Sequence, residues 1–246
     1  MTQAIITMAG FGRRFLDAGY TVPKYRIEAH GRSLFQWSML SLRSFIGEGA
    51  RFVFVVRGAD EAEAFIQAEA EAVGIADRAV VQIDAPTDGQ ATSAMLAADA
   101  IGDASAPMLI YNIDTFVHPR ALPAAAARGA GWIPCFPGQG DHWSFARTES
   151  DGRVVEVREK VRVSPHATVG LYWFDSFNRY ADAYSAYYER SGRSEAGERY
   201  VAPLYNHLLA EDAPVFIHEV PADAVVPLGV PAEVERFQAG LPPRLD

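Results

Sequence analysis

A glycine- and arginine-rich segment close to the start of the chain has the residue types that bind phosphate. An apolar run over residues 4–8 predicts a buried strand, and Gly10, Gly12 and Arg14 follow it at alternate positions. Glycines let a backbone approach an anion closely because they carry no Cβ atom, and free N–H groups in such a loop bind phosphate oxygens. Lys24 adds another positive charge shortly afterwards. The pattern therefore predicts a loop that holds the phosphates of a nucleoside triphosphate.

A carboxylate, Asp114, follows another predicted strand at residues 108–111. Ligands of open α/β sheets bind at the carboxyl ends of the strands, so we expect Asp114 at the same edge as the glycine loop. A carboxylate beside a polyphosphate is a suitable ligand for Mg²⁺, a hard cation that prefers oxygen. A plain turn or helix-capping role for Asp114 agrees with the sequence equally well.

Both positions depend on an α/β architecture, which the periodicity of the chain predicts. In the first half, strands alternate with helical segments, as in parallel sheets with right-handed crossovers. In the second half, strands follow one another closely, and Asp151-Gly152 is a hairpin signal. We therefore expect an α/β fold with a mixed, mostly parallel central sheet flanked by helices. The expected strands are 4–8, 52–56, 79–83, 108–111, 131–136, 142–148, 154–158, 167–174 and 215–219, and the expected helices are 33–45, 60–73, 91–101, 177–188, 200–209 and 232–239.

Composition restricts the class of protein. The chain has 246 residues, of which 49% are hydrophobic, and we expect one domain over 1–246, with a nucleotide-binding part at 1–118 and an acceptor-binding part at 119–246. The net charge of -9 argues against a general nucleic-acid binder. A single cysteine, Cys135, rules out an internal disulfide, and neither a signal-peptide pattern nor an apolar run of about 20 residues is present. We expect a cytoplasmic protein with no membrane partner, and the sequence leaves homo-oligomer formation open.

The motifs resemble those of the sugar-phosphate nucleotidylyltransferases, which have a glycosyltransferase-A-like fold. In that family a G-x-G-x-R loop is followed by Pro-Lys, here Pro23-Lys24, and by a metal-binding aspartate after a strand. Four further segments match in the family's order, and they are Gly89-Gln90-Ala91, Glu159-Lys160, Val169-Gly170-Leu171-Tyr172 and Gly229-Val230-Pro231. More specifically, the chain is similar to the short family members associated with capsule or surface-polysaccharide synthesis.

The resemblance implies that an NTP and a sugar 1-phosphate give an NDP-sugar and pyrophosphate, with Mg²⁺ as cofactor. A glycine- and aromatic-rich segment at 138–145 adds one candidate, His142, to the acceptor site. The expected catalytic residues are Arg14, Lys24 and Asp114, the nucleotide-binding residues are Ala9, Gly10, Gly12, Arg13, Gly89 and Gln90, the acceptor-binding residues are His142, Glu159, Lys160 and Gly170, and the metal ligands are Asp114 and Asp223.

Two departures from the family pattern leave alternatives open. Pro227 stands where the family often has a second metal-binding aspartate, and Asp223 or Glu219 could substitute for it, although the family pattern supports neither. Val161 follows Glu159-Lys160 where the family usually has proline. The alternatives are a cytidylyltransferase that acts on a non-sugar phosphate or phosphonate, and a non-catalytic protein that binds a nucleotide or nucleotide-sugar.

Overall fold

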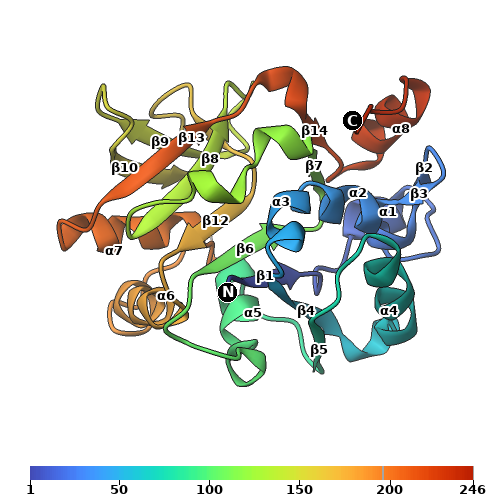
Figure 1. The fold of residues 1–246 in the computed structure, drawn as a ribbon, viewed down its shortest axis with the longest axis horizontal. Helices are drawn as coiled ribbons and strands as arrows, with labels where there is room; N and C mark the ends of the chain where they lie inside the picture. Colours follow the sequence, from blue (N-terminus) through green and yellow to red (C-terminus); the bar gives the residue numbers. More distant parts are fainter. Residues whose placement is uncertain (196, 246) are drawn as a thin grey trace.

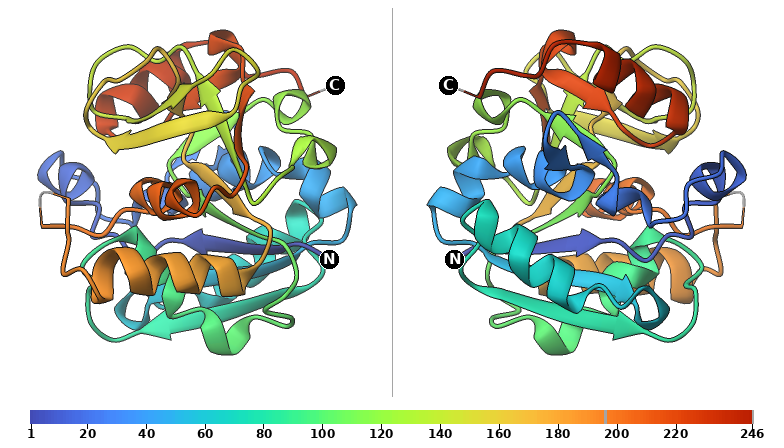
Figure 2. Two further views of the ribbon diagram at one scale, coloured as in Figure 1. Left: turned by 90° about the vertical axis from the view of Figure 1, so that its left-hand side faces the viewer. Right: turned by 90° about the vertical axis from the view of Figure 1, so that its right-hand side faces the viewer.

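A ten-stranded mixed sheet with helices on both of its faces forms the centre of the molecule (Figure 1). The computed structural model describes residues 1–195 and 197–245. The strand order is β10-β9-β11-β8-β12-β6-β1-β4-β5, and β13 pairs with β8. The views in Figure 2 place the β8–β10 strands and β5 at opposite ends of the molecule. The α/β fold with a mixed, mostly parallel sheet is confirmed.

The first half of the chain builds the parallel part of this sheet. Strand β1 lies between β4 and β6, β4 also pairs with β5, and all three pairings are parallel. Apolar residues fill these strands because both of their faces are covered. The elements of this part are β1 (Gln3–Thr7), α2 (Leu34–Leu40), α3 (Arg43–Gly47), β4 (Arg51–Arg57), α4 (Glu63–Ala72), β5 (Arg78–Ile83), α5 (Gln90–Met95) and β6 (Met108–Asn112).

Alternation along the strands divides the interior between two cores. In β1, Ile6 packs with the cluster beneath α2 and α4, whereas Ile5 packs with the cluster beneath α5 and α6. In β4, Phe54 and Val55 face the same two clusters in turn. Because successive side chains of a strand point to opposite faces, each core holds the register of the strands in place.

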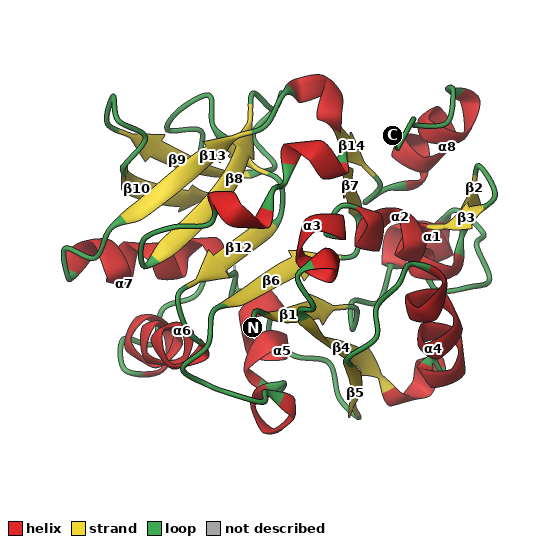
Figure 3. Cartoon of the chain, viewed as in Figure 1, coloured by secondary structure: helices red, strands yellow, loops and turns green. Residues whose placement is uncertain are grey.

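The second half of the chain adds antiparallel strands, as the close spacing of its apolar runs predicts (Figure 3). Its hairpin between β9 and β10 turns at Gly152, which has φ 81°, and the Asp151 carboxylate accepts a hydrogen bond from the Arg153 N–H at 2.9 Å. The elements are β8 (Gly131–Phe136), β9 (Ser144–Thr148), β10 (Val154–Glu159), β11 (Ala167–Thr168), β12 (Leu171–Phe174), α6 (Phe177–Tyr184), α7 (Tyr205–Ala210) and β13 (Val215–Glu219).

The other elements are short and do not belong to the ten-stranded sheet, and among them β14 and β7 form a small sheet of their own, as do β2 and β3. The C-terminal strand β14 (Val225–Pro227) pairs with β7 (Thr115–Val117), and helix α8 (Pro231–Ala239) follows it. The remaining elements are α1 (Arg13–Asp17), β2 (Glu28–Ala29) and β3 (Arg32–Ser33), the 3₁₀ turns Lys24–Arg26, Gly58–Asp60, Ala98–Ala100, Pro119–Ala121, Ala124–Ala126, Ala202–Leu204 and Ala222–Ala224, and the π-helical Ser185–Glu189.

Several expected elements are shorter or divided. The helix expected at 33–45 is two helices, and the hydroxyl of Ser41 between them accepts a hydrogen bond from the Val117 N–H. The strand expected at 167–174 breaks at Gly170, whose φ of 83° is incompatible with an extended strand. The β2–β3 and β7–β14 pairs were not expected, because two or three residues carry too little periodicity. In the described part of the chain, no helix combines the length and apolarity that a membrane span requires.

Candidate active site

The glycine loop follows β1, and Asp114 follows β6. The two strands pair in parallel with Thr7 opposite Asn112, so the glycine loop and Asp114 leave the sheet at the same edge. Gly12 has φ 60° and precedes α1, a conformation that glycine adopts without the steric cost of a Cβ atom. The expectation that these segments share one edge of the sheet therefore agrees with the structure.

An ion pair joins the two segments. The Lys24 ammonium lies 2.8 Å from a carboxylate oxygen of Asp114, and their side chains are 19% and 31% exposed. The Asp114 carbonyl accepts a hydrogen bond from the Leu228 N–H at 2.8 Å, which ties the C-terminal segment to this position. At the adjacent Gly229, a Cβ atom would lie 3.5 Å from the same carboxylate oxygen, so glycine leaves more room beside the carboxylate.

Two arginines begin helix α1 on the solvent side of this pair. Arg13 and Arg14 are exposed, whereas Phe15 next to them is buried in a cluster with Phe116 and Leu228. This anchoring of Phe15 keeps the start of α1 against the protein and leaves both guanidinium groups accessible to an anion.

Gln90 lies across the ends of both central strands. Its side-chain amide donates hydrogen bonds to the Thr7 hydroxyl at 3.2 Å and to the side-chain oxygen of Asn112. The preceding Gly89 has φ 146°, and a Cβ atom there would lie 2.4 Å from the Arg199 carbonyl oxygen. Only glycine fits this approach between the loop before α5 and residue 199 of the second half.

Gly170 makes a comparable approach from the second half of the chain. Its φ is 83°, and its carbonyl accepts a hydrogen bond from the Asn112 N–H at 3.1 Å. A Cβ atom on Gly170 would lie 2.5 Å from the Asn112 side-chain nitrogen. Gly170 therefore leaves the space in which Asn112 reaches Gln90.

Glu159 is the last residue of strand β10, which pairs with β9, and Lys160 follows it. The Glu159 side chain is 7% exposed and accepts a hydrogen bond from the Ser144 hydroxyl, and burial raises its pKa above the usual range. The Lys160 ammonium is 2.5 Å from the Tyr200 hydroxyl. Lys160 itself has φ 53°, a left-handed conformation that costs a non-glycine residue of order 1–3 kcal/mol.

His142 lies near Lys160, because its neighbour Trp143 is hydrogen-bonded to Lys160. It is exposed, and its ring centre is 4.5 Å from that of Trp143. The Trp143 carbonyl accepts a hydrogen bond from the Lys160 N–H at 2.9 Å, so the segment with His142 and the segment with Lys160 are adjacent.

Asp223 is not brought to Asp114. The β7–β14 ladder places Leu228 beside Asp114, whereas Asp223 precedes the other end of that ladder and lines a separate cavity with His118 and His218. No cluster of three or more His, Cys, Asp or Glu side chains suited to a metal occurs within residues 1–195 and 197–245. We therefore do not retain the expected metal pairing of Asp114 with Asp223.

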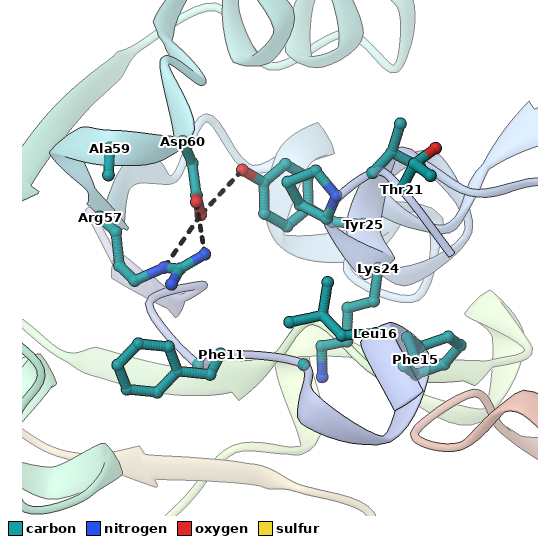
Figure 4. Close-up of a pocket in the computed structure, with 13 residues that line it drawn as sticks. Phe11, Phe15, Leu16, Thr21, Lys24, Tyr25, Arg57, Ala59 and Asp60 are labelled. Carbon is teal, nitrogen blue, oxygen red and sulfur yellow. Dashed lines mark hydrogen bonds and ion pairs between the residues drawn. The ribbon is translucent and has the colours of Figure 1, made fainter. Parts of the chain in front are cut away.

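A cavity of about 260 Å³ lies between the glycine loop, Lys24 and the turn after β4, and Figure 4 shows the residues that line it. Gly10, Phe11 and Gly12 line it, as do Arg57, the last residue of β4, and Asp60, which lies three residues further on. The cavity therefore adjoins the glycine loop and Lys24.

Sequence reasoning missed three polar residues at this edge. Thr7 and Asn112 are the last residues of two strands and each follows an apolar stretch, a signal that the sequence contains, and both bind Gln90. Tyr200 contacts Lys160 from 40 positions away, and no local pattern indicates that contact.

Solved structures resemble this chain over almost its full length. A nucleoside-diphosphate-sugar pyrophosphorylase from Vibrio cholerae RC9 shares 34% sequence identity over 97% of this chain and 100% of its own, with a TM-score of 0.90. The chain belongs to the sugar-phosphate nucleotidylyltransferase family. It is accordingly a nucleotidyltransferase.

Two solved structures with lower sequence identity have the same fold. An inositol-1-phosphate CTP transferase from T. maritima is 16% identical, with a TM-score of 0.75, 98% of this chain covered and 98% of its own. A putative glucose-1-phosphate thymidylyltransferase from Bacillus anthracis, in complex with a sucrose, is 14% identical, with a TM-score of 0.74, 97% of this chain covered and 94% of its own. No protein-family model matches the chain, and no curated protein matches it.

The Gly170–Asn112 contact predicts that Gly170→Ala costs more stability than Gly152→Ala. The two glycines have nearly equal φ, 83° and 81°, but a Cβ atom at Gly152 meets only Ile217, at 4.0 Å. We expect Gly152→Ala to lower the free energy of unfolding by about 1 kcal/mol. The clash with Asn112 should add about another 1–2 kcal/mol to the loss in Gly170→Ala. Urea unfolding measures both values, and equal losses would contradict the contact.

The buried carboxyl of Glu159 predicts a pH-dependent effect of Glu159→Gln. Because burial raises its pKa, the folded state holds this proton more tightly than the unfolded chain, so its contribution to stability declines as pH rises above about 4.3. Glu159→Gln should therefore be more stable than the wild type at pH 7 and similar to it at pH 4. In the control Glu156→Gln the difference should be reversed, because hydrogen bonds from Arg158 and Arg147 lower the pKa of Glu156. Thermal unfolding at both pH values measures the differences.

Proposed function

We propose that this nucleotidyltransferase is a Mg²⁺-dependent enzyme that joins an NTP to a sugar 1-phosphate, giving an NDP-sugar and pyrophosphate. The observation that carries the proposal is the Lys24–Asp114 pair, 2.8 Å apart at the strand edge from which the glycine loop emerges. A capsule or surface polysaccharide is the proposed destination of the sugar. Residues 1–118 would bind the nucleotide, and residues 119–246 would bind the acceptor.

The reaction requires charge neutralisation more than covalent chemistry by the protein. A phosphate oxygen of the acceptor attacks the α-phosphorus of the NTP, and the bond from that phosphorus to the oxygen bridging the β-phosphate breaks. The N–H groups at Gly10 and Gly12 and the Arg14 guanidinium would hold the departing pyrophosphate. Lys24 would lie between the α-phosphate and the attacking phosphate and reduce their repulsion. Arg13 and Ala9 would complete the phosphate side of the nucleotide site.

The base and ribose side of the nucleotide would lie against Gly89 and Gln90. Gln90 is held by Thr7 and Asn112, so its amide is oriented before any ligand binds. A side chain fixed in this way loses little entropy when it binds a nucleotide, which favours affinity.

The acceptor would occupy the edge formed by Glu159, Lys160, Gly170 and His142. Lys160 would bind its phosphate after leaving Tyr200, and Glu159 would accept hydrogen bonds from sugar hydroxyls. His142 is exposed next to Trp143 and would contact the far side of the acceptor. Such a group of aromatic and charged side chains suits a small polar ligand.

The residues at the strand edge fit a magnesium ion that arrives with the triphosphate. Mg²⁺ in nucleotide sites takes one or two carboxylates, substrate phosphates and several waters, so Asp114 supplies a sufficient protein ligand. Glu233 lies near Gly229 as well, but its carboxylate already accepts hydrogen bonds from the Gly229 and Val230 N–H groups at 2.8 and 3.1 Å. When bound, the ion would reduce the negative charge of the phosphate oxygens.

A second candidate keeps the chemistry and changes the acceptor. Val161, 53% exposed, follows Lys160 where the family usually has proline, and the T. maritima neighbour is named as a CTP transferase for inositol 1-phosphate. Cytidylyl transfer to a non-sugar phosphate or phosphonate is therefore the alternative. A screen of pyrophosphate release with four NTPs, several sugar 1-phosphates and phosphocholine-like acceptors separates the two. No release with any pair would favour a non-catalytic binding protein.

Arg14→Ala should reduce pyrophosphate release at least about 100-fold, because a charge-assisted contact to the leaving group is lost in the transition state. The exposed Arg43→Ala is the control, since that guanidinium contacts the Leu245 carbonyl away from the loop. Rates are measured with the NTP and acceptor pair found in the screen. An Arg14→Ala rate within twofold of the wild type would remove Arg14 from the proposed site.

Asp114→Asn should lower activity and weaken its dependence on Mg²⁺, because an amide is a poorer ligand than a carboxylate and leaves Lys24 without its anionic partner. A Mg²⁺ titration of the initial rate at fixed NTP measures this dependence, with Asp223→Asn as the control that should behave as wild type. Metal-independent turnover by the wild-type protein would contradict the role of Asp114.

A further inference from the structure

The segment from the glycine loop to Lys24, residues 10–24, has few buried side chains that hold it to the rest of the protein. Of residues 10–24, all of which the structure describes, Phe15 alone is buried. Phe11 and Leu16 are 41% and 55% exposed, unusual values for large apolar side chains. A segment with so few buried contacts is expected to be mobile unless its ends are anchored.

The first end of the segment rests on an arginine from another strand. The guanidinium carbon of Arg57, the last residue of β4, lies 4.9 Å from the centre of the Phe11 ring. Arg13 approaches the same ring at 5.5 Å. Both distances are within the range of a favourable cation–π contact. Figure 4 shows Phe11 beneath Arg57 at the margin of the cavity.

The second end rests on the carboxylate that holds Arg57. The Asp60 side chain is 6% exposed and accepts hydrogen bonds from Arg57 at 2.5 and 3.3 Å, and from the Tyr25 hydroxyl at 3.3 Å (Figure 4). Tyr25 immediately follows Lys24. Burial, together with the Asp60 charge, raises the pKa of Tyr25 to about 12, so the phenol remains a donor to Asp60 at neutral pH.

The residue after Asp60 has an unfavourable backbone conformation. Glu61 has φ 45°, in the left-handed region that costs a non-glycine residue about 1–2 kcal/mol. The Arg26 guanidinium donates to the carbonyls of Asp60 and Glu61 at 3.1 and 3.0 Å. Strain of this kind persists where surrounding contacts over-determine it, and it is common near functional sites.

We propose that Arg57 and Asp60 are positioning residues that anchor residues 10–24, the segment that contains the glycine loop and Lys24. Arg57 holds Phe11 at the first end of this segment, and Asp60 holds Tyr25 just after its second end. The inference rests on the proposed function only for the identity of the ligand. Arg14 and Lys24 lie between Phe11 and Tyr25 in the sequence. The Arg57–Asp60 pair therefore limits the positions that these two positive charges take before the NTP binds. Neither residue touches the reacting atoms in this assignment.

The test compares Arg57→Ala and Asp60→Asn with Arg51→Ala. Arg51 is the matched control because it begins the same strand and pairs with Asp77 at 2.5 Å, away from the loop. Hydrogen exchange of the amides in residues 10–26 is measured first, in the ligand-free protein. We expect exchange to be about fivefold faster in both test variants, corresponding to one lost anchoring interaction, and unchanged in Arg51→Ala. The conservative Asp60→Asn keeps the test usable if Arg57→Ala fails to fold.

A kinetic readout then separates positioning from general destabilisation. Using the NTP and acceptor pair from the pyrophosphate screen, KM for the NTP should rise about tenfold in both test variants, while KM for the acceptor stays within twofold. Phe11→Leu should reproduce the faster exchange, and Phe11→Trp, which keeps an aromatic ring, should not.

Equal exchange in the test and control variants would overturn the inference, as would an equal rise of both KM values. A wild-type protein that releases no pyrophosphate would refute the proposed function instead. In that case the exchange measurement still decides whether Arg57 and Asp60 anchor the loop, because it needs no ligand.

Discussion

The parallel alignment of β1 with β6 determines where the glycine loop lies relative to Asp114. Thr7 stands opposite Asn112 in this register, so the glycine loop and Asp114 leave adjacent strands at the same height. A slip of one residue would exchange the faces of Ile5 and Ile6, which are buried in different cores. Two apolar cores therefore hold the register, and through it they set the position of the Asp114 carboxylate relative to the glycine loop.

The two sides of the site differ in electrostatic character. Lys24 and Asp114 form a pair in which both side chains retain some exposure to water, and such pairs contribute little net stability. Redirecting either group to a ligand therefore costs the fold little. Glu159 is 7% exposed, and its ionisation is opposed by burial, so its state depends on what covers it. The charges of Lys24 and Asp114 are therefore already matched to each other, whereas burial disfavours the charged form of Glu159.

The parts of this arrangement that follow from local sequence were predictable. Strand periodicity predicts that the segments after β1 and β6 meet at one edge of the sheet, and Gln90 and the Lys24–Asp114 pair lie at that edge. Contacts that depend on distant segments were not predictable. The β7–β14 ladder directs Leu228 to Asp114 and carries Asp223 away from it, and neither three-residue strand has a detectable period. Likewise, no pattern around Asp60 indicates that it binds Arg57 and Tyr25 together.

Two glycines show how the requirements of the fold and of the site coincide. Gly89 and Gly170 resemble family positions that line ligands, yet each is also required by a contact between the two halves of the chain. Gly89 allows the loop before α5 to meet the backbone of Arg199, and Gly170 allows Asn112 to reach Gln90. A side chain at either position would clash with Arg199 or Asn112 and force one of them to move. Their absence of a Cβ atom therefore does not by itself indicate a ligand contact, because close packing of the two halves is sufficient to require glycine there.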